Sequence, residues 1–110
     1  MILKNGTKFS DLDSAIMFAA IVADGVWREF GVDTGVTLTS GTDGQHSPAS
    51  LHYAVNSPSG QGRAIDIRIW NLPSHEAQAP EAARLLRERL TEDYDVVVES
   101  THLHVEFDPK

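Results

Sequence analysis

The sequence contains no cysteine, and this absence removes three kinds of chemistry at once. Without thiols the chain has no disulfide bonds, no thiolate metal ligands and no cysteine nucleophile, so any metal site must be built from His, Asp and Glu. Basic residues are also few: 9 Lys and Arg stand against 16 Asp and Glu, which gives a formal net charge of -7. That charge opposes the phosphate neutralisation on which nucleic-acid binding depends, so we expect no nucleic-acid partner.

Long apolar runs are absent as well. No stretch approaches the roughly 20 apolar residues of a membrane span, and residues 1–6 lack the apolar run of a signal peptide. We therefore expect that the protein is made in the cytoplasm and does not insert into a membrane. The 110 residues are the length of one ordinary domain, and no repeat or linker divides them. We expect a single domain over residues 1–110, and a monomer.

Apolar periodicity predicts two helices. The first lies between a cap at Ser10 or Asp11 and an end at Gly31, because apolar residues recur there at three- and four-residue steps. These positions are Leu12, Ile16, Ala19, Ala23, Val26, Trp27 and Phe30. The second helix is predicted from Pro80 to Leu90, with Pro80 in its first turn.

Four short segments have the composition and alternation of strands: residues 36–40, 64–69, 96–98 and 103–107. The last two are predicted to form an antiparallel hairpin around Ser100 and Thr101. A loop of about twenty residues separates the first two, and loops of that length are usually functional. The order of the elements predicts an α+β domain in which two helices pack on one side of a small antiparallel sheet.

Histidines and acidic residues form a candidate metal site. Asp66 lies in the middle of a predicted strand, where aspartate is disfavoured, on the face opposite the isoleucines. His102, His104 and Glu106 share one face of the last strand, and His52 lies in the long loop. These are the ligand types of a catalytic zinc site, which uses three protein ligands and leaves a fourth position for water.

Other polar residues of the chain have simpler interpretations beside a functional one. His75, just before the second helix, is expected to be a surface residue, whereas His46 in the long loop is a candidate for contacting substrate. Arg68 shares the face of Asp66, and its bidentate fork suits a substrate carboxylate. Arg63 is a candidate of the same kind, although an exposed strand arginine is the simpler interpretation of either residue.

Several segments resemble the D-Ala-D-Ala zinc carboxypeptidase family, which belongs to a group that includes penicillin-insensitive murein endopeptidase and the amino-terminal domain of hedgehog. The segments are residues 39–41, 46–48, 50–53, 62–66 and 99–107, and the similarity covers roughly residues 36–109. In that group a Ser-x-His-x-x-Gly-x-Ala-x-Asp segment supplies two ligands, and a later His-x-His supplies the third from its second histidine. The resemblance implies that His52, Asp66 and His104 bind Zn²⁺.

The chain departs from this family at two places. His52 and Asp66 are fourteen positions apart, and removing residues 54–60 restores the family's spacing, so we interpret that segment as an insertion. Relatives place a catalytic acid at the position of Thr101. Two assignments therefore stay open: His104 as the ligand with His102 and Glu99 catalytic, which we prefer, or His102 as the ligand with Glu99 recovering the spacing of the acid.

The resemblance implies a hedgehog/DD-peptidase-like fold and a zinc metallopeptidase that hydrolyses peptidoglycan stem peptides. The activity would be that of a D-Ala-D-Ala carboxypeptidase or of an L-Ala-D-Glu or cross-link endopeptidase. The small size and the missing export signal resemble phage endolysins, which reach the cell wall after a partner permeabilises the membrane; a bacterial housekeeping hydrolase is the alternative source. Two rival functions stay open: a non-catalytic zinc-stabilised binding or virion structural module, and a metal-free interaction domain.

Overall fold

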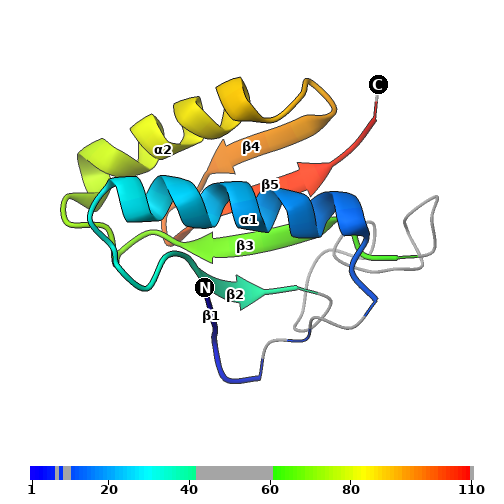
Figure 1. The fold of residues 1–110 in the computed structure, drawn as a ribbon, viewed down its shortest axis with the longest axis horizontal. Helices are drawn as coiled ribbons and strands as arrows, with labels where there is room; N and C mark the ends of the chain where they lie inside the picture. Colours follow the sequence, from blue (N-terminus) through cyan, green and yellow to red (C-terminus); the bar gives the residue numbers. More distant parts are fainter. Residues whose placement is uncertain (7, 9–10, 42–60, 110) are drawn as a thin grey trace.

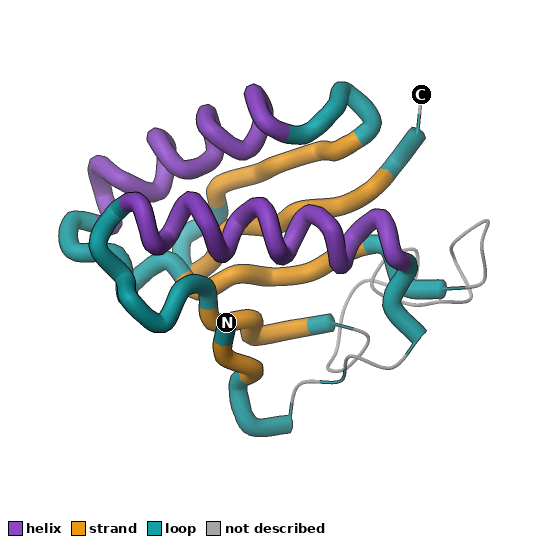
Figure 2. Tube along the Cα trace, viewed as in Figure 1, coloured by secondary structure: helices purple, strands orange, loops and turns teal. Residues whose placement is uncertain are grey.

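Two helices cover one face of a five-stranded mixed sheet in the computed structural model, which describes residues 1–6, 8, 11–41 and 61–109 (Figures 1 and 2). The elements in chain order are β1 (Ile2–Leu3), α1 (Ser14–Glu29), β2 (Thr37–Ser40), β3 (Ala64–Arg68), α2 (His75–Arg89), β4 (Tyr94–Val98) and β5 (His102–Phe107). The strand order in the sheet is β1-β2-β3-β5-β4. The predicted α+β class with two helices on one side is confirmed.

The sequence predicted an antiparallel sheet, and this prediction is wrong for one pair of strands. β1 pairs with β2 in parallel, whereas the β2–β3, β3–β5 and β4–β5 pairs are antiparallel. A strand of two residues carries no periodicity of its own, so β1 could not be recognised from the sequence. The backbone N–H groups of Ile2 and Lys4 donate to the carbonyls of Val36 and Leu38, which fixes this edge.

The helix face of the sheet carries the hydrophobic core. Ile65 and Ile67 of β3 and Leu103 and Val105 of β5 are almost fully buried, and they belong to one cluster with side chains from both helices. Trp27 of α1 is also fully buried, and such side chains each contribute roughly 1.5–3 kcal/mol on burial. Because strand residues alternate, the intervening residues of β3 and β5 point to the opposite face.

Helix α1 follows the predicted apolar pattern but begins at a different cap. Asp13 is the N-cap, and its Oδ1 accepts from the N–H of Ala15 at 2.9 Å, whereas Asp11 lies outside the helix with a positive φ. The other predicted cap, Ser10, lies outside the described residues. Gly31 follows the C-cap with φ of 90°, a conformation that glycine adopts without a Cβ penalty.

Helix α2 is longer than predicted. It begins at His75, so Pro80 is inside the helix rather than in its first turn. Pro80 has no N–H to donate to the carbonyl of Glu76, but Glu76 is exposed and its carbonyl can be hydrated. His75 is an exposed residue, as expected, although it is the first residue of the helix and does not precede it.

The predicted hairpin is confirmed. Its strands extend to Tyr94–Val98 and His102–Phe107, and the N–H of Glu99 donates to the carbonyl of His102 at 2.9 Å across the turn. Tyr94 at the start of β4 packs against the Phe107 ring and donates from its hydroxyl to the carbonyl of Ala15 at 2.8 Å. The hairpin is therefore tied to the first turn of α1.

Candidate functional site

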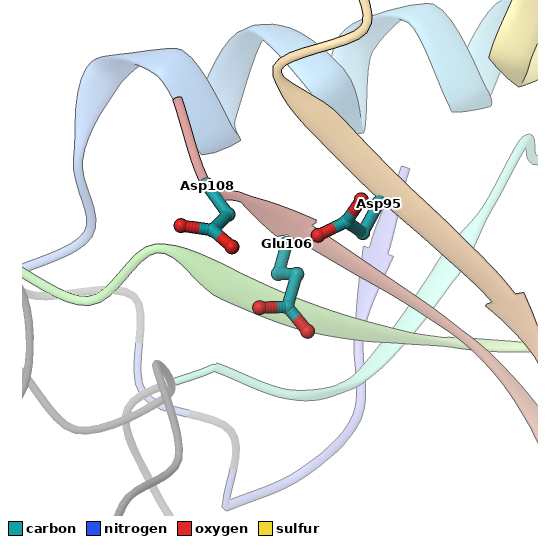
Figure 3. Close-up of side chains that lie close together, drawn as sticks. All are labelled: Asp95, Glu106 and Asp108. Carbon is teal, nitrogen blue, oxygen red and sulfur yellow. The ribbon is translucent and has the colours of Figure 1, made fainter. Parts of the chain in front are cut away.

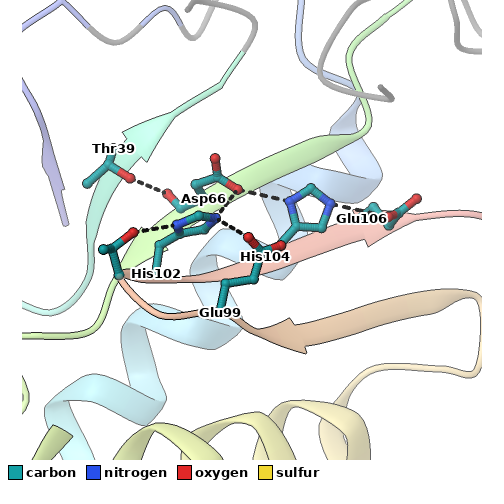
Figure 4. Close-up of polar contacts among 7 residues, drawn as sticks. Thr39, Asp66, Glu99, His102, His104 and Glu106 are labelled. Atoms are coloured by element: carbon teal, nitrogen blue, oxygen red, sulfur yellow. Dashed lines mark hydrogen bonds and ion pairs between the residues drawn. The ribbon is translucent and has the colours of Figure 1, made fainter. Parts of the chain in front are cut away.

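The candidate site lies on the face of the sheet that the helices leave uncovered, as Figure 4 shows with α1 behind the strands. Asp66 of β3 is directly opposite His104 of β5 in the antiparallel register, and His102 is one strand repeat away on the same face. Directly opposed side chains have Cβ atoms about 4.5–5.5 Å apart, so the register alone brings this carboxylate and this imidazole into contact.

Asp66 is buried, with 8% of the residue exposed, although the sequence predicted a strand with one solvated face. Ala64, on the same face, is also buried, so both faces of β3 are covered over most of its length. A register shift between Leu38 and Ser40 of the neighbouring β2 lies directly beside Asp66, and such bulges often occur next to active sites. The aspartate is therefore held in a well-defined environment.

The two predicted ligands Asp66 and His104 are brought together. Oδ1 of Asp66 lies 2.9 Å from Nδ1 of His104. Two ligand atoms of one tetrahedral zinc, each about 2.0–2.2 Å from the ion, are themselves about 3.3 Å apart. An opening of a few tenths of an ångström would therefore allow both atoms to bind one ion, and the pair fits a zinc site.

His104 lies between two carboxylates, because its Nε2 is 3.2 Å from Oε1 of Glu106. Burial disfavours the charged imidazolium, but the hydrogen bonds and negative charges of Asp66 and Glu106 outweigh that effect and raise the pKa of His104 above 6.5. Metal binding requires the neutral imidazole and competes with this protonation.

His102 occupies a different environment. Its Nε2 lies 3.2 Å from Oε2 of Glu99 and 3.5 Å from Oδ1 of Asp66, and its Nδ1 lies 3.0 Å from the hydroxyl of Thr101. Glu99 is about half exposed and directly follows β4, at the start of the hairpin turn. The structure thus brings together the two predicted catalytic residues, His102 and Glu99.

The predicted third ligand, His52, and the predicted substrate contact His46 lie outside the described residues, as does the proposed insertion of residues 54–60. Within the described part of the chain, Asp66, His102 and His104 do not place three donor atoms all within 4.8 Å of one another. This spacing is compatible with one of the two histidines acting as a ligand while the other performs a separate role.

The two candidate substrate-binding arginines differ sharply. Arg63 pairs with the Asp13 cap at 3.0 Å and lies over the Phe107 ring, with 14% of its side chain exposed, which favours a structural role. Arg68 lies opposite His102 on the site face, and its guanidinium stacks on the exposed Trp70 ring at 4.3 Å. Its buried Nε has no hydrogen-bond partner among the described residues, so Arg68 is the better candidate for an anionic group.

A second acidic group, which the sequence did not indicate, lies toward the other end of β5. Asp95, Glu106 and Asp108 place carboxylate oxygens within 4.8 Å of one another (Figure 3). Asp95 is directly opposite Glu106 in the hairpin, a register that the predicted turn could have supplied. Partly exposed acidic groups of this kind are common without an ion, and we assign no metal to them.

Comparisons of the chain with protein-family models, with curated proteins and with solved structures find no match. Among the described residues, no helix is long and apolar enough to cross a lipid bilayer. The function is therefore inferred from the side chains of the sheet face and from the residue patterns of the chain.

Proposed function

We propose that this protein is a zinc-dependent peptidase that hydrolyses peptidoglycan stem peptides, with a fold of the hedgehog/DD-peptidase type. The observation that carries the proposal is the contact between Asp66 and His104, whose facing atoms are spaced nearly as two ligands of one ion are. His52 is the proposed third ligand. The Zn²⁺ would supply a water of lowered pKa and a Lewis acid for the peptide carbonyl.

The chain's own residues divide the remaining work. His102 and Glu99, 3.2 Å apart, form the pair that takes a proton from the attacking water and delivers it to the leaving amine. Because Glu99 is half exposed and His102 is only a quarter exposed, Glu99 connects the pair to solvent. Arg68 is beside His102 and has no carboxylate partner in the part of the chain that the structure describes, so it is the proposed contact for an anionic group of the substrate.

The proposed site of action is the cell wall, in the manner of a phage endolysin. The substrate class follows from the family resemblance, and it includes a terminal D-Ala-D-Ala bond as well as L-Ala-D-Glu and cross-link bonds. A non-catalytic zinc-stabilised module of the same fold is the competing assignment, because Thr101 stands where relatives carry an acid.

The deciding experiment is digestion of purified peptidoglycan by the zinc-loaded protein, followed by mass spectrometry of the released fragments. We expect soluble peptide fragments from the wild type and from Asp95→Asn, and none from His104→Ala or from a chelator-treated sample. Stoichiometric zinc without released fragments would favour the binding module, and absence of zinc would contradict the metal site itself. The identity of the fragments also defines the bond that is cut.

A further inference from the structure

The imidazole of His104 has a different carboxylate at each nitrogen. Nδ1 faces Asp66 at 2.9 Å, and Nε2 faces Glu106 at 3.2 Å, so the ring lies between them along the sheet face (Figure 4). A histidine that binds a metal through one nitrogen almost always donates its other N–H to a carboxylate, a carbonyl or water. The two contacts of His104 are therefore not equivalent in a zinc site.

The surroundings of Glu106 direct its carboxylate toward His104. Glu106 is two residues after His104 on β5, so the two side chains share a face. Across the sheet, Glu106 is opposite the small Ala64 of β3 on one side and opposite Asp95 of β4 on the other. Asp95 and Asp108 bring like charges close to Glu106, whereas the ring of His104 offers it an N–H.

We propose that Glu106 is a positioning residue that accepts the Nε2–H of His104 and thereby makes Nδ1 the metal-binding nitrogen. This inference rests on the proposed zinc site. Holding the proton on Nε2 fixes the tautomer, the orientation and the basicity of the ring. Nδ1 is then left with a lone pair directed at the position next to Oδ1 of Asp66.

The two histidines of the His-x-His pattern differ in the groups that contact their ring nitrogens. His102 has the hydroxyl of Thr101 at Nδ1 and two carboxylates, Glu99 and Asp66, at Nε2. Within residues 1–6, 8, 11–41 and 61–109, no carboxylate therefore lies at the nitrogen of His102 opposite to its Asp66 contact. The role of Glu106 thus selects His104 as the ligand and leaves His102 for proton transfer.

The test compares zinc affinity among four proteins by competition with a chromophoric chelator: wild type, Glu106→Ala, Glu106→Gln and Asp95→Asn. Loss of a carboxylate that orients a metal-bound histidine typically weakens metal binding about 10–100-fold, and we expect a loss in this range for Glu106→Ala. Glu106→Gln keeps an oxygen acceptor at the same position and should recover most of the affinity. Asp95→Asn removes one negative charge from the same group of carboxylates and should bind zinc nearly as the wild type does.

A second measurement does not depend on affinity. Long-range ¹H–¹⁵N NMR spectra of the zinc-loaded wild type should show a protonated Nε2 and a metal-bound Nδ1 for His104. A metal-bound Nε2 would overturn the inference, as would equal zinc affinities for Glu106→Ala and wild type. Equal losses in Glu106→Ala and Asp95→Asn would also overturn it, because a general charge effect would then explain the result. Failure of the wild type to bind zinc would instead remove the proposed metal site, and this role with it.

Discussion

Zinc should stabilise the folded protein strongly, and the size of the effect can be worked out from the chain. A ligand that binds only the folded state at 100 times its dissociation constant stabilises that state by about 2.7 kcal/mol. Unfolding entropy near the melting temperature is about 2.1 cal/mol/K per residue, or about 0.23 kcal/mol/K for a chain of 110 residues. The melting temperature should therefore rise by about 12 °C over that of a chelator-treated sample.

The assay is differential scanning calorimetry of the same preparation with chelator and with excess Zn²⁺, in a buffer that does not bind zinc. Asp66→Asn keeps the size of a buried side chain but removes the charged ligand, so its zinc-dependent shift should be less than half that of the wild type. Asp95→Asn changes the charge by the same amount on the neighbouring hairpin strand and should keep the full shift.

Two results would refute the reasoning. A wild type whose melting temperature is the same with zinc and with chelator has no folded-state zinc site. Equal shifts in wild type and Asp66→Asn would mean that zinc binds elsewhere, and the partly exposed acidic residues near Glu106 would then be the next place to test. Zinc binding to histidines of the unfolded chain lowers every shift alike and does not change the comparison.

Three further predictions concern pH, packing and substrate. In the metal-free, chelator-treated protein, the raised pKa of His104 contributes stability that is complete below about pH 6.5 and is lost as the pH rises through the folded-state pKa. Urea unfolding at several pH values should show this loss of stability. The variant His104→Gln should lack this pH dependence. Arg63→Met removes the ion-pair partner of the buried Asp13 carboxylate and should cost about 3 kcal/mol by urea unfolding, whereas Arg84→Met on the exposed face of α2 should leave the midpoint unchanged. Arg68→Lys keeps the charge but loses the fork, so it should raise KM for fragment release while kcat changes little; an unchanged KM would exclude a substrate contact.

Local patterns allowed most of the fold to be predicted. The apolar stripe of α1 and the alternating isoleucines of β3 both mark the side of the element that packs in the hydrophobic core, and the spacing of residues encodes that side directly. The β4–β5 hairpin was predictable because its turn is short. The helix start at Asp13 was missed because Ser10, Asp11 and Asp13 are all residue types that cap helices, and the ion pair that distinguishes Asp13 is made with Arg63, fifty positions away.

The sequence identified the residues of the candidate site, but it did not predict which of their side chains are in contact. Asp66 was noticeable because aspartate is a poor fit to a strand interior, and the repeat of β5 placed His102 and His104 on one face. The register between β3 and β5 is a long-range pairing, so the direct opposition of Asp66 and His104 could not be derived. The contact of Glu106 with Nε2 depends on that register too, because Ala64 is its neighbour on β3.

The balance of charge on the sheet face is an electrostatic argument for the proposed cation. Among the described residues of this face, Asp66, Glu99 and Glu106 carry three negative charges and Arg68 carries one positive charge, so the face is negative before any imidazole is protonated. Protonation of His104 offsets part of this negative charge, and the carboxylates of Asp66 and Glu106 raise the pKa of His104 accordingly. A divalent cation between Asp66 and His104 offsets the same charge without the proton. Zinc affinity should therefore increase with pH up to the point at which His104 is neutral in the metal-free protein.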